Sequence, residues 1–139
     1  MEFKVYESLP EEAKQIRIKV FVEEQGFQEE FDDADKGAVH IVIFENGIAA
    51  TTCRFFYSSE KESFVIGRVA VRKEFRNKHY GAKLMELAEK EIANRCGKIV
   101  TLSAQYQVEG FYEKLGFRKM PGGRCGFALR RVLHGHPAE

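Results

Sequence analysis

The chain lacks the features that mark several large classes of protein. Its three cysteines, Cys53, Cys96 and Cys125, lie far apart and form no CxxC pair, which argues against a disulfide framework, a zinc site or a redox centre. No apolar run approaches the ~20 residues that a membrane-spanning helix needs, and the charged start Met-Glu-Phe-Lys does not resemble a signal peptide. We therefore expect reduced, mostly buried thiols and a cytoplasmic protein without membrane contact.

An excess of charge of one sign is also lacking. The 22 Lys and Arg residues and 21 Asp and Glu residues leave a formal net charge of +1, so no overall field attracts nucleic acid. Neither GxxxxGK[ST] nor a complete GxGxxG is present, which argues against an ordinary nucleoside triphosphate or dinucleotide site, and HExxH is absent too. The composition, 44% hydrophobic and 31% charged, predicts one globular domain over residues 1–139.

The spacing of apolar residues predicts a mixture of strands and helices. Strands are expected at 2–6, 39–44, 48–56, 63–71, 98–103, 117–120 and 127–132, and helices over about 10–25, 81–96 and 107–115. Asn46-Gly47 is typical of a hairpin turn, and Gly97 is expected to cap the helix before it. A helix separates two of the strands, which therefore pair in parallel. The predicted fold is α/β (α+β), with a mixed, mostly antiparallel central sheet, one parallel β-α-β crossover and helices on both faces.

The most informative segment is the basic turn, residues 72–82, which connects a strand ending Val69-Ala70-Val71 to a helix. The first turn of a helix has N–H groups without partners inside the helix, and the helix dipole favours an anion there. Cationic side chains add to this effect, and they are Arg72, Lys73, Arg76 and Lys78. The basic turn is therefore predicted to bind a phosphorylated ligand.

Two signatures resemble those of the GNAT superfamily of N-acetyltransferases. Arg76-x-x-His79-x-Gly81 resembles the Arg/Gln-x-x-Gly-x-Gly/Ala signature of that family. Further along, Gly110-Phe111-Tyr112-Glu113-Lys114-Leu115-Gly116-Phe117 resembles its FYxKxGF stretch. Upstream, Val20-Phe21-Val22-Glu23-Glu24-Gln25, with the acids that follow and His40, is similar to the ElaA/YjcF-like branch. The resemblance covers residues 1 to about 120.

The resemblance implies acetyl-CoA as co-substrate and no metal. The pyrophosphate is expected on the basic turn, and the pantetheine on main-chain groups of the preceding strand, whose side chains are expected in the core. The implied binding residues are Val69, Ala70, Val71, Arg76, Asn77, Lys78, His79, Tyr80, Gly81, Ala82, Gln105 and Tyr112. His79 stands where the family has glycine, so its backbone either is left-handed, at a cost of up to ~1–2 kcal/mol, or follows a differently shaped turn.

The resemblance also implies catalytic groups. A tyrosine with a pKa near ~10 stays protonated at neutral pH, so Tyr112 is the expected general acid for the departing thiolate, with a core aromatic role as the alternative. An alkylamine starts as an ammonium, and its deprotonation costs roughly 4 kcal/mol without a base. Glu24, with its neighbour Glu23, and His40 are the candidate bases. The alternatives are a charged helix end and a structural histidine.

The predicted activity is transfer of an acetyl group from acetyl-CoA to a primary amine, expected to belong to a small molecule, by direct attack in a ternary complex. A cluster of acids favours a cationic acceptor such as a polyamine, although a solvated loop explains it more simply, and its members are Glu29, Glu30, Asp32, Asp33 and Asp35. The alternative function is a non-catalytic acyl-CoA-binding or regulatory module of the same fold. A homodimer is compatible with the sequence.

Overall fold

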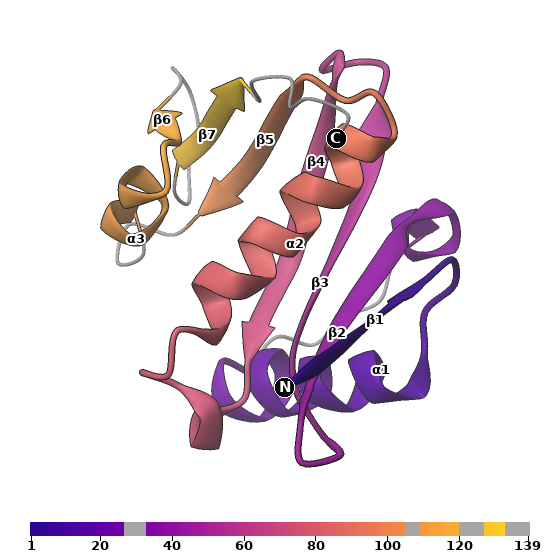
Figure 1. The fold of residues 1–139 in the computed structure, drawn as a ribbon, viewed down its shortest axis with the longest axis vertical. Helices are drawn as coiled ribbons and strands as arrows, with labels where there is room; N and C mark the ends of the chain where they lie inside the picture. Colours follow the sequence, from indigo (N-terminus) through magenta and orange to yellow (C-terminus); the bar gives the residue numbers. More distant parts are fainter. Residues whose placement is uncertain (27–32, 105–108, 120–126, 133–139) are drawn as a thin grey trace. The chain divides into compact units, whose positions relative to one another are not determined.

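A computed structural model describes residues 1–26, 33–104, 109–119 and 127–132. They belong to two compact units, one of Met1–Phe56 with Arg68–Ala88 and one of Tyr57–Gly67 with Glu89–Glu139. Strand β4 (Ser63–Val71) and helix α2 (Tyr80–Asn94), both labelled in Figure 1, contribute residues to both units. Within the described ranges, no helix is long and apolar enough to cross a membrane. The assignment of one domain to residues 1–139 stays a prediction.

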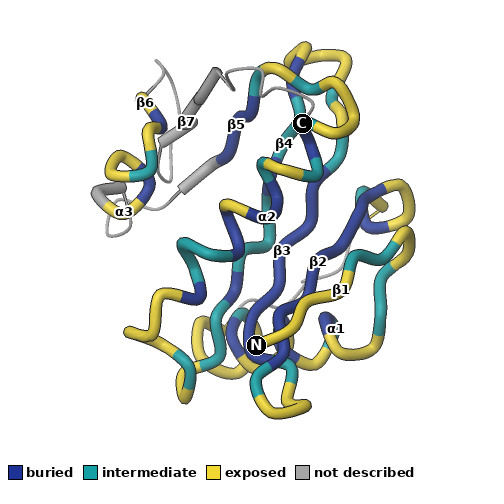
Figure 2. The backbone as a smooth tube through the Cα atoms, in the orientation of Figure 1, coloured by how far each residue is buried: buried dark blue, intermediate teal, exposed yellow. Residues whose placement is uncertain are grey.

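The strands of the first unit form an antiparallel meander. β1 (Glu2–Tyr6) pairs with β2 (Val39–Glu45), and β2 pairs with β3 (Ile48–Ser58). Between β2 and β3, Asn46 has a φ of 53° and Gly47 a φ of 80°, as a two-residue hairpin turn requires. The predicted hairpin is therefore confirmed, and Figure 2 shows that its two strands, β2 and β3, are mostly buried.

The N-terminal helix begins as predicted but changes its pitch. α1 spans Glu11–Arg17 and continues in π-helical turns over Ile18–Glu24, so the helical region ends one residue before the predicted Gln25. Apolar side chains of this region pack on β2 and the end of β4, and the buried set is Ala13, Ile16, Val20, Val42, Phe44 and Ala70. This packing fixes the end of the π-helical segment, which carries Glu24, within the first unit.

Helix α2 buries the predicted apolar face, but its cap differs from the prediction. Cys96, not Gly97, is left-handed, with a φ of 66°. The Gly97 N–H bonds the Ile92 carbonyl at 2.9 Å and the Cys96 N–H bonds the Ala93 carbonyl at 2.9 Å, which is the Schellman pattern. Glycine is needed at 97 for space, since a Cβ would lie 2.4 Å from Ile92 and 2.7 Å from Phe64.

The second unit contains the predicted parallel pairing. Phe64 and Val65 of β4 lie opposite Val100 and Thr101 of β5 (Ile99–Ala104). β5 pairs antiparallel with β7 (Phe127–Val132), and β7 pairs antiparallel with β6 (Arg118–Lys119). The short helix α3 (Glu109–Lys114) precedes β6. The predicted mixed, mostly antiparallel sheet with one parallel pairing is thus confirmed.

The thiols follow the prediction only in part. Cys53 is buried, and burial raises the pKa of its thiol to about 12. Cys96 is exposed, because it lies beyond the last turn of α2. Cys125 lies outside the described residues.

Candidate active site

The basic turn presents the start of α2 as the sequence predicts. The first hydrogen bond of the helix runs from the Lys83 N–H to the His79 carbonyl at 3.1 Å. The N–H groups of residues 80–82 precede it and therefore have no partner within the helix. Asn77 and His79 are both left-handed, with φ values of 64° and 66°. The turn thus keeps its left-handed position despite the missing glycine, at the cost expected for a residue with a Cβ.

Aromatic side chains fix the start of α2. Tyr80 is buried, and its hydroxyl donates a hydrogen bond to Glu45 at the end of β2. This hydrogen bond is the main cause of a raised pKa of Tyr80, and burial of the phenol adds to it. The Phe75 ring lies edge-on to the Tyr80 ring with centroids 5.9 Å apart, and Lys78 Nζ lies 5.7 Å from the Phe75 centroid. The side chain of Tyr80 thus anchors the start of α2 to the end of β2.

The end of β4 leads into this turn. The pairing with β5 covers Phe64 and Val65, and Arg68, with a φ of 50°, then interrupts the extended conformation. Residues 69–71 follow this interruption. Ala70 is buried, whereas Val69 and Val71 are only partly buried. The expectation that all three side chains lie in the core is therefore met by Ala70 alone.

Arg76 and Glu24, predicted for different roles, are in direct contact. Arg76 Nη2 lies 2.6 Å from Glu24 Oε1, and Arg76 Nη1 lies 3.0 Å from Glu24 Oε2. The same guanidinium donates from Nε to the Val71 carbonyl at 3.0 Å. The structure therefore brings a predicted base and a predicted phosphate ligand together as a bidentate ion pair.

Asp35 does not belong to an exposed acidic cluster, contrary to the prediction. It is 6% exposed and pairs with Arg17 Nη1 at 2.8 Å and with Arg54 Nη1 at 2.9 Å. A buried carboxylate requires such partners, because desolvation of an isolated charge is costly. Asp33 is exposed, whereas Glu29, Glu30 and Asp32 lie outside the described residues.

His40 lies beside this buried ion pair network. It is 1% exposed, and its Nε2 lies 3.2 Å from the Asp35 carbonyl, which makes Nε2 the donor. Its Nδ1 is buried and has no hydrogen-bond partner among the described residues. Burial lowers the pKa of His40; the Asp35 contacts oppose this effect, and the Arg17 and Arg54 charges add to it. His40 is therefore held as a neutral imidazole.

Acidification is expected to destabilise the protein through His40. The unfolded chain takes up this proton near pH ~6.5, whereas the native state takes it up only at lower pH, so stability falls below pH ~6.5 by up to about 1.4 kcal/mol per pH unit. Urea unfolding between about pH 7.5 and about pH 5.5 measures this decline. His40→Gln should flatten it, and His79→Asn, which removes an exposed histidine, should not. An equal decline in the His40→Gln variant would contradict the assignment.

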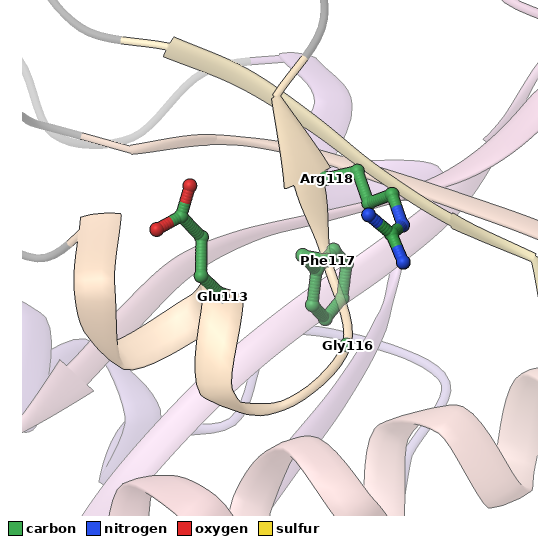
Figure 3. Close-up of a pocket in the computed structure, with 4 residues that line it drawn as sticks. All are labelled: Glu113, Gly116, Phe117 and Arg118. Atoms are coloured by element: carbon green, nitrogen blue, oxygen red, sulfur yellow. The ribbon is translucent and has the colours of Figure 1, made fainter.

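Tyr112 lies in the second unit, on α3. It is 7% exposed, and its ring lies edge-on to Phe117, with centroids 6.0 Å apart, and to Phe111, with centroids 5.0 Å apart. An open cavity of about 270 Å³ follows α3, lined by Glu113, Gly116, Phe117 and Arg118 (Figure 3). None of the predicted site residues that the structure describes lines this cavity. Gln105 lies outside the described residues.

The comparisons with known proteins agree with this geometry. Among protein families, the one described as acetyltransferase (GNAT) domain matches this chain over residues 6–128. The chain belongs to the GNAT acetyltransferase family. A Bacillus subtilis (strain 168) protein that carries the name of an acetyltransferase is 31% identical over 111 residues, which are 76% of this chain and 74% of that protein.

Solved GNAT structures match the fold over nearly the whole chain. Escherichia coli ElaA is 26% identical with a TM-score of 0.82, over 94% of this chain and 98% of that chain. An acyl-CoA N-acyltransferase from Pseudomonas aeruginosa is 26% identical with a TM-score of 0.81, over the same shares of the two chains. The predicted family is therefore confirmed, and it is a family of acyltransferases.

Proposed function

We propose that the protein transfers an acetyl group from acetyl-CoA to a primary amine of a small molecule, by direct attack in a ternary complex. The observation that carries this proposal is the start of α2, where N–H groups without helical partners directly follow the end of β4 and the basic turn. Family membership and the likeness to an acyl-CoA N-acyltransferase support a coenzyme A thioester as the donor. The acceptor, a cytoplasmic location and a homodimer stay predictions.

The backbone of the basic turn would hold the cofactor. The pyrophosphate would accept hydrogen bonds from the N–H groups of residues 77–82, at the positive end of the α2 dipole. Main-chain groups of residues 69–71 would bind the pantetheine and polarise the thioester carbonyl. Lys78 adds a cation that its contact with the Phe75 ring orients.

The transfer step needs one acid and one base. The amine nitrogen attacks the thioester carbon and loses a proton to a base or to solvent, the C–S bond breaks, and the leaving thiolate takes a proton from the Tyr112 hydroxyl, which regains one from solvent. Glu24 and His40 are the candidate bases, and each carries a contact that competes with this role. Glu24 pairs with Arg76, and His40 is buried with its donor nitrogen on the Asp35 carbonyl. An amine that arrives already neutral is the third route, and the pKa of the acceptor then sets the pH dependence.

Gly81→Val is expected to weaken coenzyme A binding by roughly 10²-fold, because a branched side chain in the first turn of α2 separates the phosphate from at least two charge-assisted hydrogen bonds. Calorimetric titration of coenzyme A measures the change. Gly37→Val is the matched control, since Gly37 has open space around a Cβ and no left-handed backbone. Unchanged affinity in the Gly81→Val variant would contradict the assignment of the basic turn as the pyrophosphate site.

An acyl-CoA-binding module without turnover is the second candidate. Mixing the protein with acetyl-CoA and a panel of amines separates the two functions, since only an enzyme releases free thiol in step with acetylated amine. Binding in the titration without thiol release would favour the module.

A further inference from the structure

The guanidinium of Arg76 is already engaged by the protein. A guanidinium has five N–H donors arranged around forked edges that suit carboxylates and phosphates. Glu24 accepts from both terminal nitrogens, Nη1 and Nη2, and so occupies one edge. The Val71 carbonyl accepts from Nε on the other edge. Arg76 therefore offers no complete fork to a phosphate in this arrangement.

These contacts join three segments of the first unit. Glu24 is the last residue of the π-helical segment Ile18–Glu24, Val71 is the last residue of β4, and Arg76 opens the second half of the basic turn. Isolated ion pairs on a surface contribute little, but bidentate pairs with good geometry contribute more. The side chains of Arg76 and Glu24 are only 40% and 33% exposed. The pair is placed to hold the turn against the strand and the helix.

We propose that Glu24 and Arg76 form a positioning pair for the basic turn: Arg76 shapes the turn, the backbone N–H groups bind the diphosphate, and Glu24 orients Arg76 rather than serving as the base. This inference rests on the proposed function for its cofactor. Both oxygens of Glu24 accept hydrogen bonds from Arg76, so uptake of an amine proton would break the pair. The same contact thus gives Arg76 and Glu24 one shared role.

The first test uses the free protein and needs no cofactor. Glu24→Gln and Arg76→Gln should each make the hydrogen-bonded amides of the basic turn, those of Arg72 and Phe75, exchange with solvent roughly tenfold faster, because the turn then opens more often. The double variant should exchange no faster than either single variant, since the two residues act as a unit. Exchange rates that stay at the wild-type value in both single variants would overturn the proposal.

The second test measures coenzyme A binding and turnover on the full chain. Both single variants should raise the dissociation constant of coenzyme A and the KM for acetyl-CoA by roughly tenfold, and the double variant should add little. The pH dependence of kcat should keep its wild-type shape in Glu24→Gln. Tighter binding in Glu24→Gln would mean that Glu24 competes with the diphosphate, and a lost pH limb would mean that it is the base, so either result overturns the proposal.

A charge exchange distinguishes positioning from direct contact. In the Glu24→Arg/Arg76→Glu double variant the pair can re-form with its charges exchanged, and coenzyme A affinity should recover at least part of what Arg76→Glu alone loses. If Arg76 were a phosphate ligand, Glu at position 76 would repel the diphosphate and the exchange would recover nothing.

The matched control is another ion pair of similar exposure. Arg95 Nη1 lies 2.8 Å from Glu91 Oε1, and the two side chains are 32% and 26% exposed. Glu91→Gln should leave both amide exchange in the basic turn and coenzyme A affinity unchanged. If wild-type protein binds no coenzyme A, the proposed function fails, whereas the exchange experiment still decides whether the pair positions the turn.

Discussion

Tyr112→Phe is expected to lower kcat by about 10²–10⁴-fold with little change in coenzyme A affinity. The substitution removes only the hydroxyl, and the aromatic ring keeps its edge-on contacts with Phe111 and Phe117. The thiolate would then leave without a protein proton donor, which is the step that general acid catalysis accelerates. Steady-state kinetics with acetyl-CoA and an accepted amine, together with calorimetry, separate turnover from binding.

Tyr57→Phe is the matched control for this experiment. Tyr57 also lies edge-on to a phenylalanine, Phe64, with ring centroids 5.4 Å apart, but it is 57% exposed and has no predicted role. Its loss of a hydroxyl should leave kcat unchanged. Wild-type turnover in Tyr112→Phe, with chemistry shown to be rate-limiting, would place Tyr112 among the core aromatics.

Asp35→Asn is expected to cost about 3–5 kcal/mol of the free energy of unfolding. The asparagine has nearly the same volume, so the change removes charge rather than packing. It leaves Arg17, which is 1% exposed, and Arg54, which is 5% exposed, without the anion that both contact. Loss of an anion that two buried cations share is among the few causes of so large an effect for one residue. Urea unfolding followed by circular dichroism measures the loss.

Asp33→Asn is the matched control for the stability measurement. Asp33 lies two residues away, its side chain is fully exposed, and its Oδ1 lies 4.0 Å from Lys36 Nζ. A substitution of this kind should change stability by no more than about 0.5 kcal/mol. A similar small change in Asp35→Asn would show that the two arginines are solvated without Asp35.

Local sequence signals determined the elements of the fold. Asn46-Gly47 specified the hairpin because only residues that tolerate positive φ fit that turn, and the structure has both of them left-handed. The apolar spacing of Leu84, Leu87 and Ala88 specified the buried face of α2. The family signature marked the turn before this helix, but it left two conformations open for His79, and the structure has the left-handed one. These features depend on neighbours in the chain, so the sequence alone was sufficient.

The local sequence signal placed the cap of α2 at Gly97, next to the residue that is left-handed in the structure. Glycine usually marks the left-handed position after a helix, yet Cys96 takes that position here. Gly97 is required by its distance to the Phe64 ring, which belongs to a strand far away in the sequence. Steric requirements between distant segments leave no trace in local spacing.

The charged contacts were decided by tertiary structure alone. From the sequence, Asp35 resembles the other acids of a solvated loop. The signal for a buried carboxylate was an arginine inside each of two apolar segments, Arg17 and Arg54. Arg76 and Glu24 are far apart in the chain, and each fits a separate role when considered alone. Pairing between distant charges depends on which side chains the fold brings within hydrogen-bond distance and on how much water it removes around them. Composition and periodicity specify neither quantity, so only the folded arrangement assigned these residues their partners.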